Sequence, residues 1–380
     1  MQKLNLMPEI LVDSLLILFS VCTGIHMVFY LFIYSGVAFT RKKNNSANAS
    51  LPAVSVIICA KNEEAFLQKH LPYILEQDYP EFEVIVVNDC SIDNTQVLLN
   101  DLQKKHPRLR SLIIHEDKVY KHSKKLPLTV GIRSAQYEYL VFTDADCRPA
   151  SNNWLKTMMS SFDDTTEIVL GYGAYGKKKG LVNYFIRMDT FQIGLQYLSL
   201  AMAGMPYMGV GRNLAYKKSL FLKQKGFAPY SHIPSGDDDL FVNKAATRFN
   251  TRIASAPDSV TISEPKESLK EWVRQKRRHV STAKYYRFST LFILGLTTFS
   301  QYMFWLSLIP LLFTIWWQVA VALFVLRLLM QLLVFYKAMQ KLGEKDLLLY
   351  SPVIEWLLLF GFYPGVAVSN MLFKQVTWKS

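Results

Sequence analysis

The chain has 380 residues, of which 51% are hydrophobic and 19% charged, and 43 Lys and Arg against 30 Asp and Glu give a formal net charge of +13. This composition is too apolar for an ordinary soluble enzyme, and the length allows two or three domains. Excess basic charge can indicate a nucleic-acid partner. We expect none here, because the basic residues gather beside apolar segments that are long enough to cross a membrane.

The first predicted membrane span covers residues 10–39, an apolar run interrupted mainly by Asp13 and His26. It is long enough to cross a bilayer. Because the basic residues 41–43 follow it, we expect a retained anchor rather than a cleaved signal peptide. The small residues 35–38 keep cleavage as the alternative.

After a polar linker at residues 44–50, apolar runs alternate with amphipathic stretches. Strands are predicted at Val54–Cys59, Val84–Val87, Leu112–Ile114 and Tyr139–Phe142. Helices are predicted at Glu64–Glu76, Thr95–Lys105 and Lys124–Gln136. This alternation is typical of βαβ units, so we predict an α/β domain with a mainly parallel sheet covered by helices on both faces. Ligands of such sheets bind beyond the carboxyl ends of the strands.

Polar and acidic residues follow three of these strands, at Ala60–Glu64, Asn88–Thr95 and Asp144–Asp146. Ser91 and Asp93 could simply cap the next helix. Asp144 and Asp146 could reach one divalent ion, and carboxylate oxygens suit Mg²⁺ or Mn²⁺. An acidic turn that merely ends a strand is the alternative.

Other segments of the middle region predict less specific features. Residues 171–180 indicate a flexible basic loop, and residues 184–203 a helix that belongs either to the core or to the bilayer surface. The four cysteines lack paired metal-ligand spacing, so we interpret them as small apolar side chains in a reducing compartment: Cys22, Cys59, Cys90 and Cys147.

Residues 290–336 form a second apolar block, with the length of two crossings and a join near residues 314–317. Residues 346–373 predict one more, although Pro352 interrupts the apolar run and the carboxylate of Glu355 needs a partner within a membrane. We therefore predict four spans, one before and three after the polar middle.

Lys and Arg residues set the orientation. They gather at Arg41, Lys42 and Lys43, at Lys284 and Arg287, and at Lys337, Lys341 and Lys345. With four spans all three groups fall on one side, which the positive-inside rule makes cytoplasmic. We expect an integral protein of a bacterial cytoplasmic membrane with three units: residues 1–51, an anchor and linker; residues 52–288, a cytoplasmic domain with interfacial helices; and residues 289–380, the C-terminal membrane helices.

Three motifs together resemble those of family 2 glycosyltransferases: residues 54–64, 86–95 and 143–146. The resemblance covers roughly residues 52–283 and extends to the membrane-bound branch of the family. It implies a Rossmann-like domain of the GT-A type that binds a nucleotide-diphosphate sugar, with a UDP-sugar favoured.

The resemblance also implies roles on the donor side. Glu63 and Asp89 match positions that contact the nucleoside, with Asp89 at the base. Lys124 matches a lysine near the nucleotide, and Lys125 takes that place if the alignment shifts by one residue.

The same resemblance separates the two carboxylates of residues 144–146. Asp146 is expected to be the principal ligand of Mg²⁺ or Mn²⁺. Asp144 is expected near the ribose and the diphosphate, and as a second metal ligand.

Residues 235–240 resemble the segment that supplies the catalytic base in this family. The alignment puts the base at Asp237, with Asp238 close behind. Ser235 or Asp237 could instead cap the helix that starts here. Three adjacent carboxylates exceed what a cap needs, and their repulsion would raise at least one pKa, as a general base requires.

Residues 275–279 resemble the Gln-x-x-Arg-Trp motif of membrane-bound synthases. On a helix, Gln275, Arg278 and His279 share one face and could point into the site, where Arg278 suits a diphosphate oxygen. We expect Arg274, Lys276 and Arg277 to serve the membrane surface. Because His279 replaces the usual Trp, the aromatic platform for a sugar acceptor is in doubt, and with it processive synthesis.

On the acceptor side, residues 209–214 resemble an acceptor-side strand, so Arg212 and Asn213 are expected acceptor contacts together with His279. The expected function is an inverting, membrane-bound glycosyltransferase that serves a lipid-linked or glycan acceptor. A processive polysaccharide synthase and a non-catalytic nucleotide-sugar-binding scaffold remain the alternatives.

Overall fold

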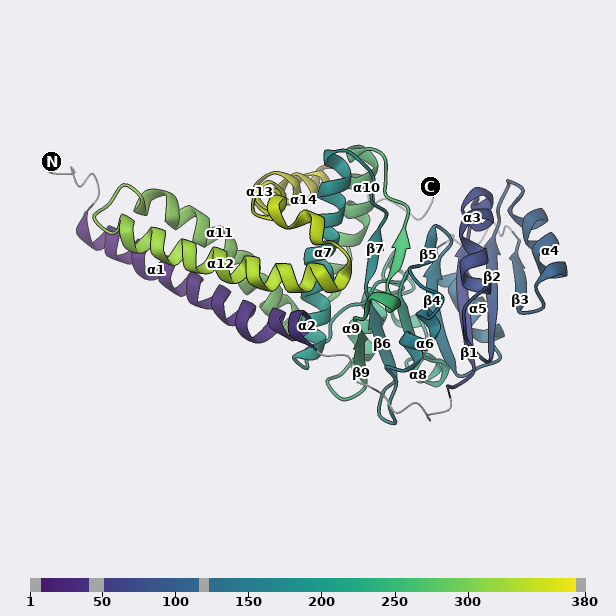
Figure 1. The fold of residues 1–380 in the computed structure, drawn as a ribbon. Coiled ribbons are helices and arrows are strands. Elements are labelled where there is room, and N and C mark those ends of the chain that lie inside the picture. Colours follow the sequence, from purple (N-terminus) through teal and green to yellow (C-terminus); the bar gives the residue numbers. More distant parts are fainter. Residues whose placement is uncertain (1–7, 41–50, 116–122, 374–380) are drawn as a thin grey trace.

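The computed structural model describes residues 8–40, 51–115 and 123–373. The predicted basic cluster at residues 41–43 and the linker at 44–50 lie outside the described residues. Figure 1 shows an elongated molecule with a rod of long helices at one end and an α/β domain at the other. The rod consists of α1 (Glu9–Val28), α11 (Phe288–Leu311) and α12 (Trp317–Leu342).

A seven-stranded sheet with the order β3-β2-β1-β4-β8-β6-β9 forms the centre of the α/β domain. The first four strands of this order are parallel to one another: β1 (Val54–Ala60), β2 (Phe82–Asp89), β3 (Leu109–Ile114) and β4 (Tyr139–Asp144). The helices between them are α3 (Glu64–Leu75), α4 (Thr95–Lys105) and α5 (Lys125–Ser134). The predicted α/β class and parallel sheet are therefore confirmed.

Both faces of this half-sheet are buried, which explains why β1 and β2 are almost continuously apolar. Ile57 and Ile85 pack with Ile132 of α5 on one face. Val56 packs with Leu67 of α3 on the other. Parallel strands covered in this way present only their carboxyl ends to a ligand.

The second half of the domain completes the sheet and adds a small one. The remaining strands of the large sheet are β6 (Ile168–Gly171), β8 (Leu214–Lys217) and β9 (Thr251–Ala254), with β8 antiparallel to both β4 and β6. The small sheet has the order β5-β10-β7, formed by Cys147–Pro149, Thr261–Ser263 and Gly173–Tyr175. Short helices connect these strands: α6 (Trp154–Met159), α8 (Lys218–Lys223) and α9 (Asp239–Ala245).

Residues 184–203 belong to the core rather than to the bilayer surface. They form most of α7 (Leu181–Met202), a largely buried helix. Arg187 on this helix donates from Nε to Oε2 of Glu344 at 2.9 Å and from Nη2 to Oδ1 of Asp346 at 2.7 Å. This ion pair joins the core helix to the segment that follows α12.

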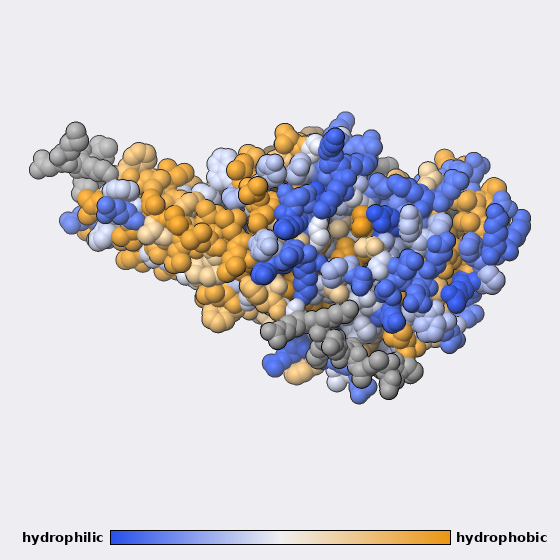
Figure 2. All heavy atoms as spheres, in the orientation of Figure 1, coloured by the Kyte–Doolittle hydropathy of each residue, from blue (hydrophilic) through white to orange (hydrophobic). Residues whose placement is uncertain are grey.

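Within the described residues, four helices are long and apolar enough to cross a membrane, as predicted: Glu9–Phe39, Phe288–Leu311, Trp317–Leu342 and Lys345–Leu372. The first comprises α1, the π-helix η1 (Phe29–Tyr34) and α2 (Ser35–Phe39). The last comprises η5 (Lys345–Tyr350), α13 (Ser351–Leu357), the π-helix η6 (Leu358–Phe362) and α14 (Tyr363–Leu372). Figure 2 shows that apolar side chains cover the rod, whereas the surface of the α/β domain is mainly polar.

Glu355, the carboxylate within the last candidate span, has partners in a neighbouring helix. Its Oε1 lies 3.7 Å from Nη2 of Arg327, and its Oε2 accepts a hydrogen bond from Gln331. A carboxylate among membrane helices is tolerated when it is paired in this way.

Candidate active site

The loops after β1 and β2 hold each other in place at the carboxyl edge of the sheet. Asn62 and Cys90 adopt positive φ angles of 55° and 54°, which turn the chain sharply beyond each strand. The N–H of Asn62 donates to Oγ of Ser91 at 2.9 Å, and the N–H of Ile92 donates to Oδ1 of Asn62 at 2.8 Å. The two polar strand ends therefore form one edge.

Glu63 and Asp89, the predicted nucleoside-binding residues, lie on this edge. Glu63 immediately precedes α3, and its N–H donates to Oγ1 of Thr95 at 3.1 Å. Asp89 is the last residue of β2 and is fully buried. Asp93 accepts the N–H of Thr95 at 3.1 Å, so this carboxylate holds the start of α4, which is the structural role that the sequence allowed.

The carboxylates at the end of β4 converge with a thiol. Ligand atoms of Asp144, Asp146 and Cys147 all lie within 4.8 Å of one another. Burial raises the pKa of Asp146, and the nearby charge of Asp144 raises it further. A divalent cation between the two carboxylates would relieve that repulsion, so their oxygens fit Mg²⁺ or Mn²⁺.

The thiol of Cys147 is less suited to a metal. It lies 2.9 Å from Oγ of Ser263 across the small sheet. Burial raises its pKa well above the ordinary value, and a neutral thiol is a poor ligand.

Lys124 connects the two acidic motifs. Its Nζ donates to Oδ1 of Asp144 at 2.5 Å and lies 3.7 Å from Oδ2 of Asp237. Burial alone would raise the pKa of Asp144, but the ammonium of Lys124 outweighs burial and keeps that pKa below its ordinary value. Lys125, the alternative for the lysine near the nucleotide, does not suit that role in the structure. Its Nζ donates to backbone carbonyls, including that of Ser235 at 2.7 Å.

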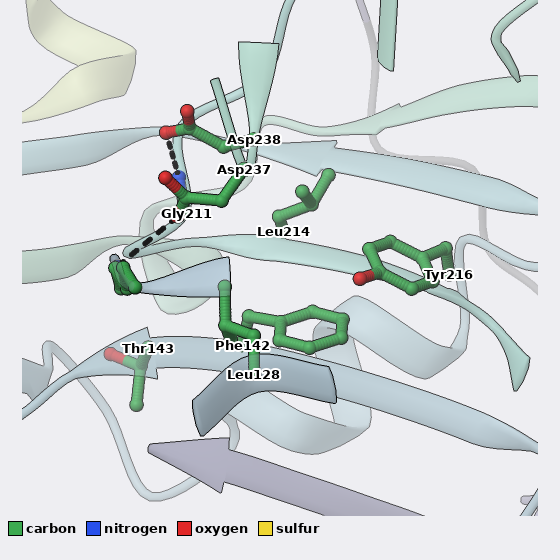
Figure 3. A pocket seen from close by; sticks show the side chains of 9 residues that line it. Leu128, Phe142, Thr143, Gly211, Leu214, Tyr216, Asp237 and Asp238 are labelled. Carbon is green, nitrogen blue, oxygen red and sulfur yellow. Dashed lines mark hydrogen bonds and ion pairs between the residues drawn. The ribbon is translucent and has the colours of Figure 1, made fainter. Parts of the chain in front are cut away.

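The three carboxylates of residues 237–239 have different partners, and Figure 3 shows two of them, Asp237 and Asp238. Asp237 faces Lys124 across a hollow of about 10 Å³. Asp238 accepts the N–H of Gly211 at 2.7 Å on Oδ2 and the N–H of Asp239 at 2.8 Å on Oδ1. Asp239 accepts a hydrogen bond from the hydroxyl of Tyr286 at 2.7 Å and another from Thr282, which tie the triplet to the segment before α11.

Asp238 therefore caps the helix, a role that the sequence suggested for Ser235 or Asp237. It precedes α9 and accepts the first N–H of that helix. Burial and the charges of Asp237 and Asp239 raise the pKa of Asp238 to about 7. Within the described part of the chain, the Asp237 carboxylate forms its ion pair with Lys124.

A larger cavity of about 250 Å³ lies beside Asp238. Its wall includes Arg212, Lys276 and His279, together with residues of α7, α11 and α14. Residues predicted for the base and for the acceptor thus line one cavity, at the border between the α/β domain and the candidate membrane helices.

Helix α10 (Leu269–Val280) carries the predicted Gln-x-x-Arg motif. Gln275 donates from Nε2 to the hydroxyl of Tyr175 at 3.0 Å. His279 lines the cavity, and Arg278 is half-buried and close enough to Asp144 to lower the pKa of that carboxyl. Among the described residues, no hydrogen bond or ion pair occupies the Arg278 guanidinium.

Lys276 contradicts the prediction that it serves the membrane surface. It is buried, forms an ion pair with Asp189 of α7 and lies with Nζ 4.8 Å from the centre of the Trp272 ring. A buried ammonium needs a buried anion, and Asp189 on a distant helix supplies it. Arg277 is half-buried and bonds to α14, where its Nε donates to Oδ1 of Asn370 at 3.2 Å.

Of the two predicted acceptor contacts after residue 211, only Arg212 lines the cavity. Its guanidinium stacks 4.5 Å above the Tyr175 ring and donates from Nη2 to the carbonyl of Gly173 at 2.6 Å. Asn213 is fully buried and its amide bonds to Trp154, Tyr172 and Ser259. The structure contradicts the prediction for Asn213, because its hydrogen bonds hold α6 and the segments at Tyr172 and Ser259 to the start of β8.

Sequence reasoning missed three side chains near the site: Cys147, Lys276 and Tyr363. Only the first had a local signal, since it is adjacent to Asp146. Lys276 looked like one more basic residue of an amphipathic helix, and Tyr363 lies in the last apolar segment, far along the chain.

Residues 55–222 match the model of glycosyl transferase family 2. These residues form a family 2 glycosyltransferase domain. The glycosyltransferase domain is similar to part of a poly-beta-1,6-N-acetyl-D-glucosamine synthase of Staphylococcus epidermidis, at 33% identity over 27% of this chain and 23% of that protein. The chain is also similar to the probable glycosyltransferase YdaM of Bacillus subtilis, at 26% identity over 60% of this chain and 54% of that protein. The chain thus spans about a quarter to about half of these curated relatives.

The fold extends the similarity beyond the family 2 domain. The solved structure of mannosyltransferase PcManGT from Pyrobaculum calidifontis, in complex with GDP-Man and Mn2+, covers 95% of this chain and 99% of its own, with a TM-score of 0.59 and 19% identity. At that identity the likeness shows a shared fold alone.

Proposed function

We propose that this protein is a membrane-bound glycosyltransferase that moves a sugar, with inversion, from a nucleotide-diphosphate donor to an acceptor hydroxyl. The observation that carries the proposal is the contact of Lys124 with both Asp144 and Asp237. It brings the predicted donor motif and the predicted base motif to one place at the carboxyl edge of the sheet. A cavity that can receive an acceptor adjoins them.

Asp237 is proposed as the general base. Both oxygens of Asp238 already accept backbone N–H groups, whereas Asp237 contacts the side chain of Lys124 at 3.7 Å. Asp237 would take the proton from the acceptor hydroxyl, whose oxygen then attacks the anomeric carbon as the bond to the diphosphate breaks. Such a single displacement needs no enzyme nucleophile.

The donor is proposed to lie along the edge formed by Glu63, Asp89 and Asp144, with a UDP-sugar favoured by the family resemblance. Asp146 and Asp144 would hold Mg²⁺ or Mn²⁺, which when bound offsets the charge of the departing diphosphate. The Mn2+ in the similar mannosyltransferase structure supports a metal of this class. Arg278 has an available guanidinium beside this site and would hold a diphosphate oxygen.

The four apolar helices support a membrane location, and we propose the bacterial cytoplasmic membrane, with residues 52–288 on the cytoplasmic side. The acceptor is proposed to be lipid-linked or a glycan that receives one or a few sugars. One feature favours this over processive synthesis: His279 stands where the membrane-bound synthases of the family usually have Trp. Product length on the purified protein decides between them.

The test is transfer by the purified full-length protein. Nucleotide-sugars are first screened for thermal stabilisation with Mn²⁺, and the best donor is then assayed for release of the nucleotide diphosphate and for labelled product. Asp237→Asn should reduce transfer by about a thousandfold while donor stabilisation persists. Equal transfer by the wild type and this variant would refute the assigned base. Donor stabilisation without release or transfer in the wild type would favour the scaffold alternative.

A further inference from the structure

The cavity beside Asp238 extends from the proposed reaction site to the candidate membrane helices. Its wall contains Ile193 of α7, Leu294 of α11 and Tyr363 of α14. The last two residues belong to separate candidate spans, Phe288–Leu311 and Lys345–Leu372. An occupant of the cavity therefore touches both the reaction site and side chains from helices that we expect to lie in the bilayer.

Five of the six tyrosines of this wall have hydroxyls that bond to the protein, so these five present ring carbons to the cavity. The sixth is Tyr172, whose hydroxyl is buried and has no hydrogen-bond partner among the described residues. The hydroxyl of Tyr197 donates to the carbonyl of Gly171 at 2.6 Å, and that of Tyr207 to Oε1 of Gln196 at 3.0 Å. The hydroxyls of Tyr286 and Tyr363 donate to carboxylates, those of Asp239 and Asp189 respectively. The hydroxyl of Tyr175 accepts a hydrogen bond from Nε2 of Gln275. A glycan needs many hydrogen-bond partners, whereas a hydrocarbon chain needs none.

Several polar residues of the wall belong to the proposed reaction site, and others lie on α7 and α10: Thr190, Gln196 and Lys276. Asp238 and Ser235 belong to the proposed base loop, and Arg212 and His279 were predicted acceptor contacts. The cavity thus combines a polar part at the chemistry with a largely apolar remainder. That distribution matches a lipid with one polar head group that carries a hydroxyl.

A buried carboxylate fixes the membrane side of this wall. Asp189 of α7 accepts a hydrogen bond from the hydroxyl of Tyr363 at 2.8 Å and pairs with Lys276 of α10. A second bridge joins the last span to α11, where the hydroxyl of Tyr302 donates to the carbonyl of Leu359 at 2.7 Å. Figure 1 shows α13 and α14 beside α7 and α10 at the junction of the rod and the α/β domain.

From this arrangement we infer that the acceptor is a membrane lipid, whose head group lies beside Asp238 and whose chain passes between Leu294 and Tyr363 into the bilayer. The inference rests on the proposed transfer and narrows its acceptor. The acceptor would reach the site without leaving the membrane.

The test uses the full-length protein in nanodiscs made from the total lipids of the membranes in which it was produced, with the labelled donor found in the stabilisation screen. Label should enter the lipid that chloroform–methanol extracts. Leu294→Trp, which fills the inferred path, should lower this labelling by about tenfold or more. Leu306→Trp is the matched control, because Leu306 lies on the same helix and is 54% exposed away from the cavity, and it should label lipid like the wild type.

Donor stabilisation of Leu294→Trp reports whether that variant is folded. If this variant shows no donor stabilisation, benzoylphenylalanine is placed at position 294 instead of tryptophan. Ultraviolet crosslinking should then capture the labelled lipid at position 294 but not at position 306. Equal lipid labelling by the wild type and a folded Leu294→Trp, or no capture of labelled lipid at position 294, would overturn the inference. Label only in water-soluble glycan would overturn it too and leave the proposed transfer standing. Only failure of the wild type to use any donor would remove the proposed function itself.

Discussion

The ammonium of Lys124 lies 2.5 Å from a carboxylate oxygen of Asp144, and it also faces Asp237 at 3.7 Å. One cation therefore stabilises two acidic motifs that are far apart in the sequence. Without it, the two carboxylates would repel each other at the edge of the sheet where the donor is proposed to bind.

Lys124→Met should weaken donor binding in the presence of Mn²⁺ by about tenfold or more, equivalent to about 1.4 kcal/mol. Lys124→Arg keeps the positive charge and should retain most of the affinity. The measurement is donor-dependent thermal stabilisation over a range of donor concentrations. Wild-type affinity in the methionine variant would show that this lysine does not organise the donor site.

The raised pKa of Asp238 predicts a pH dependence of stability. In the unfolded chain this group loses its proton near its ordinary value of 3.8, but in the folded protein it keeps the proton up to a pKa of about 7. Between these values the folded state binds more protons than the unfolded state, so its stability should fall as the pH rises from about 4 to about 7.

Asp238→Asn removes this titration, so its melting temperature should fall less than that of the wild type between pH 5 and pH 8. Asp164→Asn removes the same charge at an exposed position and serves as the control. Thermal unfolding at several pH values checks the prediction. Parallel curves for the wild type and Asp238→Asn would contradict the raised pKa.

Substitution of Asn213 distinguishes the structural role seen in the fold from the acceptor contact predicted from the sequence. Because its amide makes three buried hydrogen bonds, Asn213→Ala should destabilise the protein by about 2–4 kcal/mol, while the KM for the acceptor stays unchanged in the folded fraction. Arg212→Ala should show the converse, a raised acceptor KM, since that guanidinium faces the cavity. Melting curves and acceptor titrations on both variants distinguish the two roles. A raised acceptor KM in Asn213→Ala would restore the original prediction.

The elements that could be predicted are those with a local pattern. The continuous apolar runs of β1 and β2 gave the parallel sheet, because strands buried on both faces lack polar alternation. The abrupt change from Phe142 to Asp144 likewise marked the strand end where carboxylates meet. The four spans followed from length and hydropathy.

The parts that could not be predicted depend on distant segments. Lys276 is buried only because Asp189, on another helix, lies opposite its ammonium. The side-chain NH₂ of Asn213 is fully hydrogen-bonded only because the carbonyls of Tyr172 and Ser259 lie beside it. The residues next to Lys276 and Asn213 in the sequence do not indicate these distant partners. Lys276 therefore resembled a surface residue and Asn213 a site residue.

The most direct test of the central claim is a transfer assay on the purified full-length protein, with Mn²⁺ and with a chelator, for the wild type and Asp146→Asn. We predict that transfer by the wild type requires Mn²⁺ or Mg²⁺, and that Asp146→Asn still folds but loses about a thousandfold in transfer. Wild-type transfer that persists in the chelator, or an active Asp146→Asn protein, would contradict the proposed metal-assisted site.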